Sequence, residues 1–143
     1  LSLETPVADF NKMTDYDIMV VDVTAMPDEA SQKIAAIKAH VGTNNIGIIA
    51  TIPGSTSRAM IELTMQRFTD LAPTIALTKL DECETTASEF SAYVEQGARI
   101  SILSGTKSVI GASIFASENI LLQYLKENFS NHEAIMPTGI GLE

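Results

Sequence analysis

The sequence contains few of the residues that form disulfides, zinc sites or membrane spans. Cys83 is the single cysteine among 143 residues, so no disulfide can form within the chain. The two histidines, His40 and His132, are far apart in the sequence, which argues against a zinc site. No apolar run approaches the roughly 20 residues that cross a bilayer. We therefore expect a cytoplasmic protein in a reducing compartment.

Basic residues are also scarce. Nine Lys and Arg residues stand against 18 Asp and Glu residues, which gives a formal net charge of -9 at pH 7. Such a surface repels the backbone of nucleic acids and anionic lipids, so we expect no direct nucleic-acid binding and only indirect contact with a membrane. A phosphate-bearing ligand would need local donors.

Short apolar runs alternate with helical patterns along the chain. Four runs, at residues 16–23, 46–51, 74–78 and 99–104, are rich in Ile or Val, as strands buried on both faces should be. Between and after them, apolar residues recur every three or four positions, which is typical of helices with one buried stripe. These stripes are Ala30, Ile34, Ile37 and Val41; Ile61, Met65 and Phe68; Ala87, Phe90 and Val94; and Leu121, Leu125 and Phe129. The alternation predicts an α/β fold, a three-layer arrangement with a mainly parallel sheet and flanking helices.

The domain organisation follows from the same pattern. Residues 1–129 are predicted to form one domain. Residues 130–143 lack apolar periodicity and carry Pro137, Gly139 and Gly141, so we interpret them as a C-terminal tail.

Polar side chains gather where the predicted strands end. Ligands of parallel α/β sheets bind beyond the carboxyl ends of the strands, so these positions are the candidate site. The strand-end residues with polar or ligand-binding chemistry are Asp22, Thr51, Thr78, Lys79, Asp81, Ser104, Gly105, Thr106 and Lys107.

Residues 78–81 read T-K-L-D, and this stretch resembles the guanine-specificity motif of P-loop GTPases. In that family the aspartate accepts hydrogen bonds from N1 and the exocyclic amine of guanine, and the lysine stem lies over the ring. Adenine lacks those two donors and would leave the carboxylate unpaired. The resemblance implies that Lys79 and Asp81 read guanine and that Thr78 braces the loop. Alternatively, Lys79 and Asp81 end the strand only to reach solvent.

Two further stretches resemble the same superfamily. The segment "DYDIMVVDVTA" looks like the strand of the D-x-x-G motif, which implies that Asp22 approaches Mg²⁺ through water. The segment "ILSGTK" resembles the loop that closes over guanine, which implies a base-binding role for residues 104–107. The sequences of the predicted strands, taken together, are most similar to those of the signal-recognition-particle family of GTPases, and within it to those of the flagellar-assembly member, FlhF.

The resemblance implies a parent protein that binds GTP or GDP with Mg²⁺ and acts in protein targeting or flagellum biogenesis. It also implies a homodimer or a related GTPase as partner. The sequence departs from the family in having no G-x-x-x-x-G-K-[ST] phosphate loop, and Ala25 replaces the D-x-x-G glycine. We therefore interpret residues 1–129 as the C-terminal part of a GTPase domain. These residues alone are expected to show no turnover.

Two other interpretations stay open. "YDIMVVDVTAMPDE" also looks like the phosphorylation-site strand of a response-regulator receiver domain, with Asp22 as phosphoacceptor and with Thr51 and Lys79 at the next strand ends. The third interpretation is a non-catalytic α/β scaffold or partner-binding domain.

Cys83 is expected to be a small residue at the start of a helix and not a nucleophile. The neighbouring charges of Asp81 and Glu82 disfavour a thiolate at this position.

Overall fold

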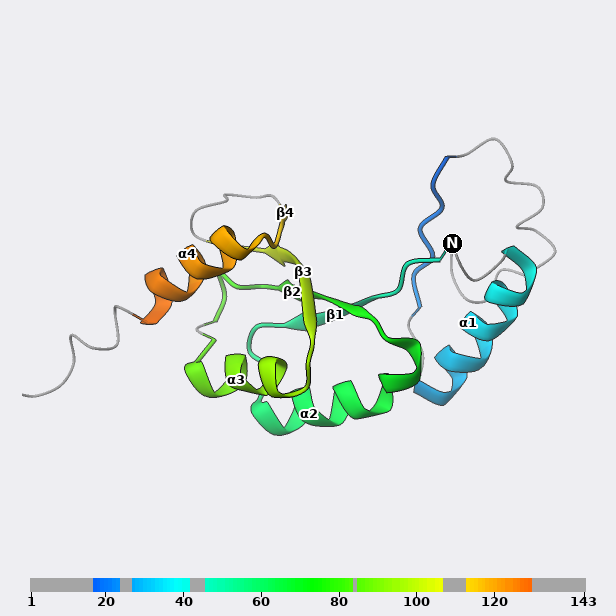
Figure 1. Ribbon diagram of the computed structural model, residues 1–143, viewed down its shortest axis with the longest axis horizontal. Helices are drawn as coiled ribbons and strands as arrows, with labels where there is room; N and C mark the ends of the chain where they lie inside the picture. The colour runs from blue at the N-terminus through cyan, green and yellow to red at the C-terminus, as the bar shows by residue number, and fades with distance from the viewer. Residues whose placement is uncertain (1–16, 24–26, 42–45, 84, 107–112, 130–143) are drawn as a thin grey trace, which may run out of the picture. The chain divides into compact units, whose positions relative to one another are not determined.

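The computed structural model describes residues 17–23, 27–41, 46–83, 85–106 and 113–129 (Figure 1). The chain divides into two compact units between Ile48 and Ile49. Unit 1 contains α1 (Pro27–Val41). The predicted tail at 130–143 and the candidate residue Lys107 lie outside the described residues. The elements of unit 2 are β1 (Ile49–Pro53), α2 (Arg58–Arg67), η3 (Thr69–Leu71), β2 (Thr74–Thr78), α3 (Ala87–Glu95), β3 (Arg99–Ser104), β4 (Ser113–Phe115) and α4 (Glu118–Phe129).

Unit 2 is built on a four-stranded, mostly parallel sheet in the order β1-β2-β3-β4. β1, β2 and β3 run parallel, and β4 is antiparallel to β3. α2 and α3 lie side by side along the sheet, and α4 follows β4 (Figure 1). The prediction of an α/β fold with a mainly parallel sheet and flanking helices is confirmed at this level. The bounds of β2 and β3 are as predicted, whereas β1 lies further along the chain than residues 46–51.

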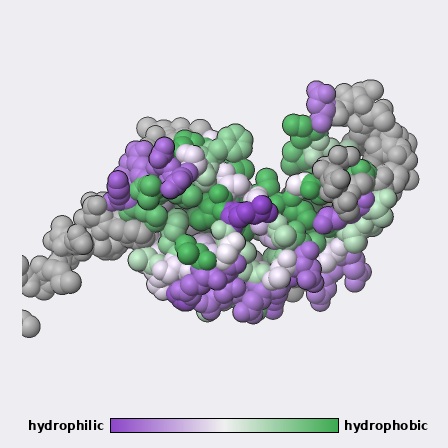
Figure 2. All heavy atoms as spheres, viewed as in Figure 1, coloured by the Kyte–Doolittle hydropathy of each residue, from purple (hydrophilic) through white to green (hydrophobic). Residues whose placement is uncertain are grey.

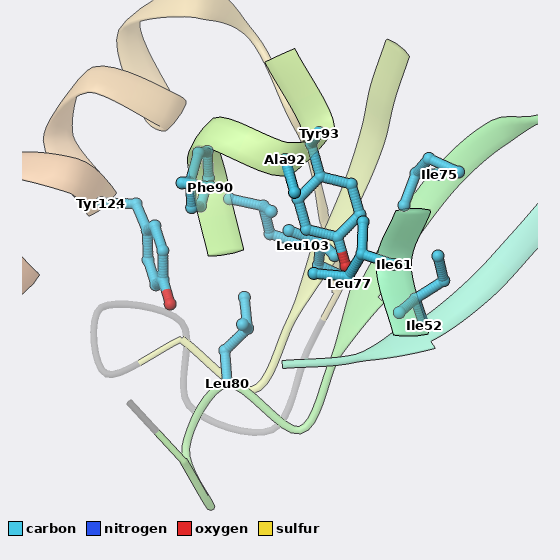
Figure 3. Close-up of a cluster of buried hydrophobic side chains, with 10 residues drawn as sticks. All are labelled: Ile52, Ile61, Ile75, Leu77, Leu80, Phe90, Ala92, Tyr93, Leu103 and Tyr124. Carbon is cyan, nitrogen blue, oxygen red and sulfur yellow. The ribbon is translucent and has the colours of Figure 1, made fainter. Parts of the chain in front are cut away.

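The core includes a row of three paired side chains, one from each of the parallel strands β1, β2 and β3. Ile52 is paired with Leu77, and Leu77 is paired with Leu103. A register irregularity between Ile75 and Ala76 sets this pairing against β3. Leu77 and Leu103 are fully buried, and Figure 3 shows the helix residues gathered around them. The full buried cluster is Ile52, Ile61, Ile75, Leu77, Leu80, Phe90, Ala92, Tyr93, Leu103 and Tyr124.

The two neighbouring helices have polar outer surfaces and defined beginnings. α3 begins after Thr86, whose main-chain N–H donates to Glu89 Oε2 at 2.6 Å, as in a capping box. Arg58 of α2 pairs with Glu62 at 2.8 Å on its own helix and with Glu95 of α3. Figure 2 shows hydrophilic side chains along this outer surface, which leaves the opposite surfaces of α2 and α3 to cover the core.

The predicted strand at residues 16–23 is wrong for the part that the structure describes. Residues 17–23 form no strand, and only Asp22 makes an isolated bridge. The side chains of Ile18 and Val20 are 82% and 80% exposed. An apolar run predicts a tendency to be buried, but a strand forms only where a neighbouring strand pairs with its main chain along its length. The prediction that strands are buried on both faces also fails for β1, where Ile49 is 53% exposed.

The predicted helical stripes are displaced in the last two helices. In α3, Phe90 is buried as predicted, but Ala87 and Val94 are exposed, and Tyr93 is buried in their place. In α4, Tyr124 is the buried residue, and Leu121 and Leu125 pack beside it at the edge of the core. The side chain of Phe129 lies outside the described residues. Among the helices that the structure describes, none has the length and apolarity to cross a membrane.

Candidate functional site

Two of the predicted site loops meet beyond the carboxyl ends of β2 and β3. The main-chain N–H of Leu80 donates to the carbonyl of Ser104 at 3.2 Å. A Cβ atom placed on Gly105 would collide with Asp81 Oδ1 and would lie 3.0 Å from Leu80 N. Gly105 has a φ of +80°, in the left-handed region that glycine adopts without strain. The absence of a side chain at position 105 therefore allows the Asp81 carboxylate to approach the backbone of the second loop.

Lys79 has an unusual backbone conformation within the first loop. Its φ is +56°, a value that is uncommon for a residue with a side chain. The carbonyl of Lys79 accepts a hydrogen bond from the Glu82 N–H at 3.2 Å and another from Cys83 Sγ at 3.0 Å. These two donors hold the turn that separates Lys79 from Asp81. The ammonium group of Lys79 is exposed and lies 3.6 Å from Glu82 Oε2.

Thr78 contributes to the loop through its main chain. Its carbonyl accepts a hydrogen bond from the N–H of Gly54 at 2.8 Å, which joins the end of β2 to the turn after β1. Gly54 is buried, and a Cβ at this position would come within 2.8 Å of both Cys83 Sγ and Leu80 Cδ2. The turn after β1 is therefore packed directly against the T-K-L-D loop.

A pair of buried hydroxyl groups, which the sequence analysis did not identify, stands behind this loop. The hydroxyl of Tyr124 in α4 donates to Thr85 Oγ1 at 3.4 Å, and the Thr85 hydroxyl donates to the carbonyl of Gly54, also at 3.4 Å. The side chains of Thr85 and Tyr124 are only 3% and 6% exposed. Burial raises the pKa of Tyr124, and the hydrogen bond to Thr85 offsets part of that rise. The sequence signal was slight: Thr85 is a polar residue just after the loop, and Tyr124 lies beside the predicted stripe of α4.

The surroundings of Cys83 favour the protonated form of its thiol. Burial, followed by the negative charges of Glu82 and Asp81, raises its pKa above the ordinary value for cysteine. The protonated thiol can donate to the Lys79 carbonyl, as it does here, whereas a thiolate cannot. The sequence predicted Cys83 at the start of a helix, but α3 begins at Ala87, so Cys83 lies in the turn before that helix.

The chemistry of the site is that of an exposed acceptor beside a cation. The carboxylate of Asp81 is exposed and can accept hydrogen bonds from two adjacent donors on a planar ligand. Lys79 is the neighbouring cation, and its four-carbon stem offers an apolar surface to a ring. In the second loop, Ser104 is half-buried, and Thr106 is 6% exposed. The structure therefore places the T-K-L-D loop beside Ser104 and Gly105, whereas Lys107 is not described.

Two further predicted candidates are described apart from these loops. Asp22 is exposed and belongs to unit 1, and Thr51 is exposed and belongs to unit 2. Within the described residues, no group of three or more His, Cys, Asp or Glu side chains is arranged to hold a metal ion.

Comparison with known proteins leaves the family open. A scan against protein-family models found no match to this chain, and a search of curated proteins found no match either. The likeness to the signal-recognition-particle GTPases therefore rests on the residues and loops described above.

Proposed function

We propose that the loop at residues 78–81, together with residues 104–107, binds the base of a guanine nucleotide. The observation that carries this proposal is the close approach of Asp81 to Gly105, accompanied by the Leu80 to Ser104 hydrogen bond. Two loops separated along the chain supply a carboxylate and a side-chain-free backbone at one place. A carboxylate held in this way can accept hydrogen bonds from two adjacent donors of a planar base.

Each residue of the site has a distinct part in the proposed binding. Asp81 accepts hydrogen bonds from N1 and the exocyclic amine of guanine, and the stem of Lys79 covers one face of the ring. Gly105 leaves space for the Asp81 carboxylate, and Ser104 fixes the loop through its carbonyl, which accepts from Leu80. The pair of donors on guanine distinguishes it from adenine, which would leave the carboxylate without partners.

The proposed parent activity is that of a GTPase of the signal-recognition-particle type, with the three-layer P-loop fold, in protein targeting or flagellar assembly. Bound GTP would supply the phosphoryl group that such an enzyme transfers to water. The residues at 78–81 and 104–107 would account only for recognition of the base, because the sequence contains no phosphate loop. In the parent, Asp22 would hold Mg²⁺ through water, and the ion would neutralise charge on the phosphates of the nucleotide.

Exchange of the Asp81 carboxylate for an amide tests the base assignment. Asp81→Asn presents a donor to the C2 carbonyl of xanthine and loses one acceptor for guanine. Hydrogen bonds to a charged group contribute about 1.5–3 kcal/mol, so GDP binding should weaken about tenfold or more. Binding of xanthosine diphosphate should strengthen in the same variant. The measurement is a titration followed by the amide resonances of residues 79–81 and 105.

The matched control is Asp70→Asn, which removes an exposed carboxylate from η3, outside the two loops. It should leave both affinities unchanged. If Asp81→Asn binds GDP as well as the unaltered chain does, Asp81 does not read the base.

A further inference from the structure

We infer that Gly54, Thr85 and Tyr124 are positioning residues for the T-K-L-D loop, through which α4 and the turn after β1 set the base-reading geometry. We call these three residues the brace. None of them belongs to the loops that contact the proposed base. The inference rests on the proposed function for the role of the loop, but the link between the brace and the loop stands on its own contacts.

The first part of the brace is a steric contact. Gly54 is placed so that a single added carbon would come within 2.8 Å of Cys83 Sγ and Leu80 Cδ2. Cys83 Sγ cannot yield without disturbing its hydrogen bond to the Lys79 carbonyl. Leu80 is 5% exposed and belongs to the packed core, so its side chain has little space for movement. The turn after β1 therefore restricts the positions of Leu80 within the loop and of Cys83 just after it.

The second part of the brace is the chain of hydroxyl groups. Tyr124 reaches from α4 toward the loop region, as Figure 3 shows beside Leu80. Its hydroxyl donates to Thr85, and Thr85 donates to the carbonyl of Gly54. At 3.4 Å both hydrogen bonds are long, but the two hydroxyl groups are buried and need polar partners. Because the N–H of Gly54 holds the carbonyl of Thr78, this chain continues to the first residue of the loop.

Local loop opening can be measured without any nucleotide. The amide of Leu80 is bonded to Ser104, so its hydrogen exchange reports separation of the two site loops. We compare it with the amides of the central strand β2, which report opening of the whole sheet. Substitution of a residue that acts only on overall stability changes the exchange rates of the Leu80 and β2 amides together. Substitution of a positioning residue changes the exchange rate of the Leu80 amide alone.

Gly54→Ala is the sharpest variant for the steric contact. Its Leu80 amide should exchange about tenfold faster relative to the β2 amides, because Cys83 and Leu80 must move. Gly47→Ala is the matched control, since a Cβ at Gly47 has no atom within 4 Å. Equal Leu80 exchange in Gly54→Ala and the unaltered chain would overturn the steric part.

Two pairs of variants test the hydroxyl chain. Thr85→Val keeps the shape of the side chain and removes the hydroxyl, and it should speed Leu80 exchange about threefold. Thr85→Ser retains the hydroxyl and should restore the slow rate. Tyr124→Phe should match Thr85→Val, and Tyr93→Phe, which alters the other core tyrosine, should leave the rate ratio unchanged. If the Leu80 amide exchanges at the same rate in Thr85→Val and in Thr85→Ser, the hydroxyl chain does not position the loop.

A nucleotide titration separates this inference from the proposed function. If the brace variants open the loop and also lower GDP affinity while ADP affinity stays the same, both proposals are supported. If the variants open the loop but the unaltered chain and its upstream-extended form bind no GDP, the brace stands and the guanine assignment falls. If GDP binds and no brace variant changes Leu80 exchange, the brace falls and the guanine assignment stands.

Discussion

The carboxylate of Asp81 lies so close to the backbone of Gly105 that position 105 has no room for a side chain. Gly105 also has a positive φ of 80°, so a substitution there meets both backbone strain and a steric clash. The two effects can be separated, because Gly97 has a similar φ of 63° but open space around its Cβ position. The pair therefore forms a natural test of the loop contact.

Gly105→Ala should destabilise the chain more than Gly97→Ala does. Each variant should lose about 1–2 kcal/mol through the left-handed conformation. Gly105→Ala should lose a further amount through displacement of Asp81. The free energies of unfolding in urea give the comparison. Equal losses in the two variants would show that Asp81 is not held against Gly105.

The pH dependence of Cys83 alkylation tests the electrostatics of the loop. Burial and the adjacent carboxylates raise the thiol pKa, so the rate should reach its midpoint at a higher pH in the folded chain than in the urea-unfolded chain. Glu82→Gln removes one negative charge and should move the folded midpoint toward lower pH. The measurement is the rate of iodoacetamide labelling between pH 7 and about 11. A folded midpoint at or below the unfolded one would contradict the protonated thiol.

Stability should fall in alkaline solution because of the buried tyrosines. Burial, and then the charge of Glu89, raises the pKa of Tyr93 above its unfolded value of about 10. The Tyr93 contribution is fully present below that unfolded pKa, and it is lost as the pH rises toward the folded pKa. Tyr93→Phe should therefore show a shallower loss of stability above pH ~10. Urea unfolding curves at several pH values decide the point, and identical slopes would exclude Tyr93 as a cause.

Truncation of Ile61 should lower the stability of the chain far more than truncation of Ile18. Ile61 is 1% exposed in the core, and Ile61→Ala should cost about 2–5 kcal/mol of unfolding free energy. Ile18 is 82% exposed, and Ile18→Ala should change stability by no more than about 0.5 kcal/mol. Chemical denaturation measures both. A large loss in Ile18→Ala would restore the buried strand that the sequence predicted at residues 16–23.

The sequence predicted the parts of the fold that depend on short-range pattern. β2 and β3 are compact apolar runs that end at T-K and S-G, so their bounds and parallel pairing followed from composition and chain order. The segment at 17–23 has an equally apolar pattern, yet pairing depends on a partner strand that a pattern cannot identify. β4 escaped prediction because three residues are too few to show a period.

The same distinction applies to the site. The meeting of Asp81 and Gly105 was predictable, because the carboxyl ends of parallel strands share one edge. The contact between Tyr124 and Thr85 spans 39 positions and depends on the rotation of α4 about its axis. The predicted stripe placed Leu121 and Leu125 in the core and left Tyr124 out, so the hydroxyl chain could not be foreseen.

Recognition of guanine by the two loops can be measured by titration with GDP and with ADP in the presence of Mg²⁺. The chain and an upstream-extended form would be measured side by side by calorimetry, with the amide resonances of residues 79–81 and 105 as local reporters. If the two loops read guanine, GDP should shift these resonances and bind more tightly to the extended form, and ADP should do neither. Equal responses to GDP and ADP, or no response in either form, would contradict the proposal.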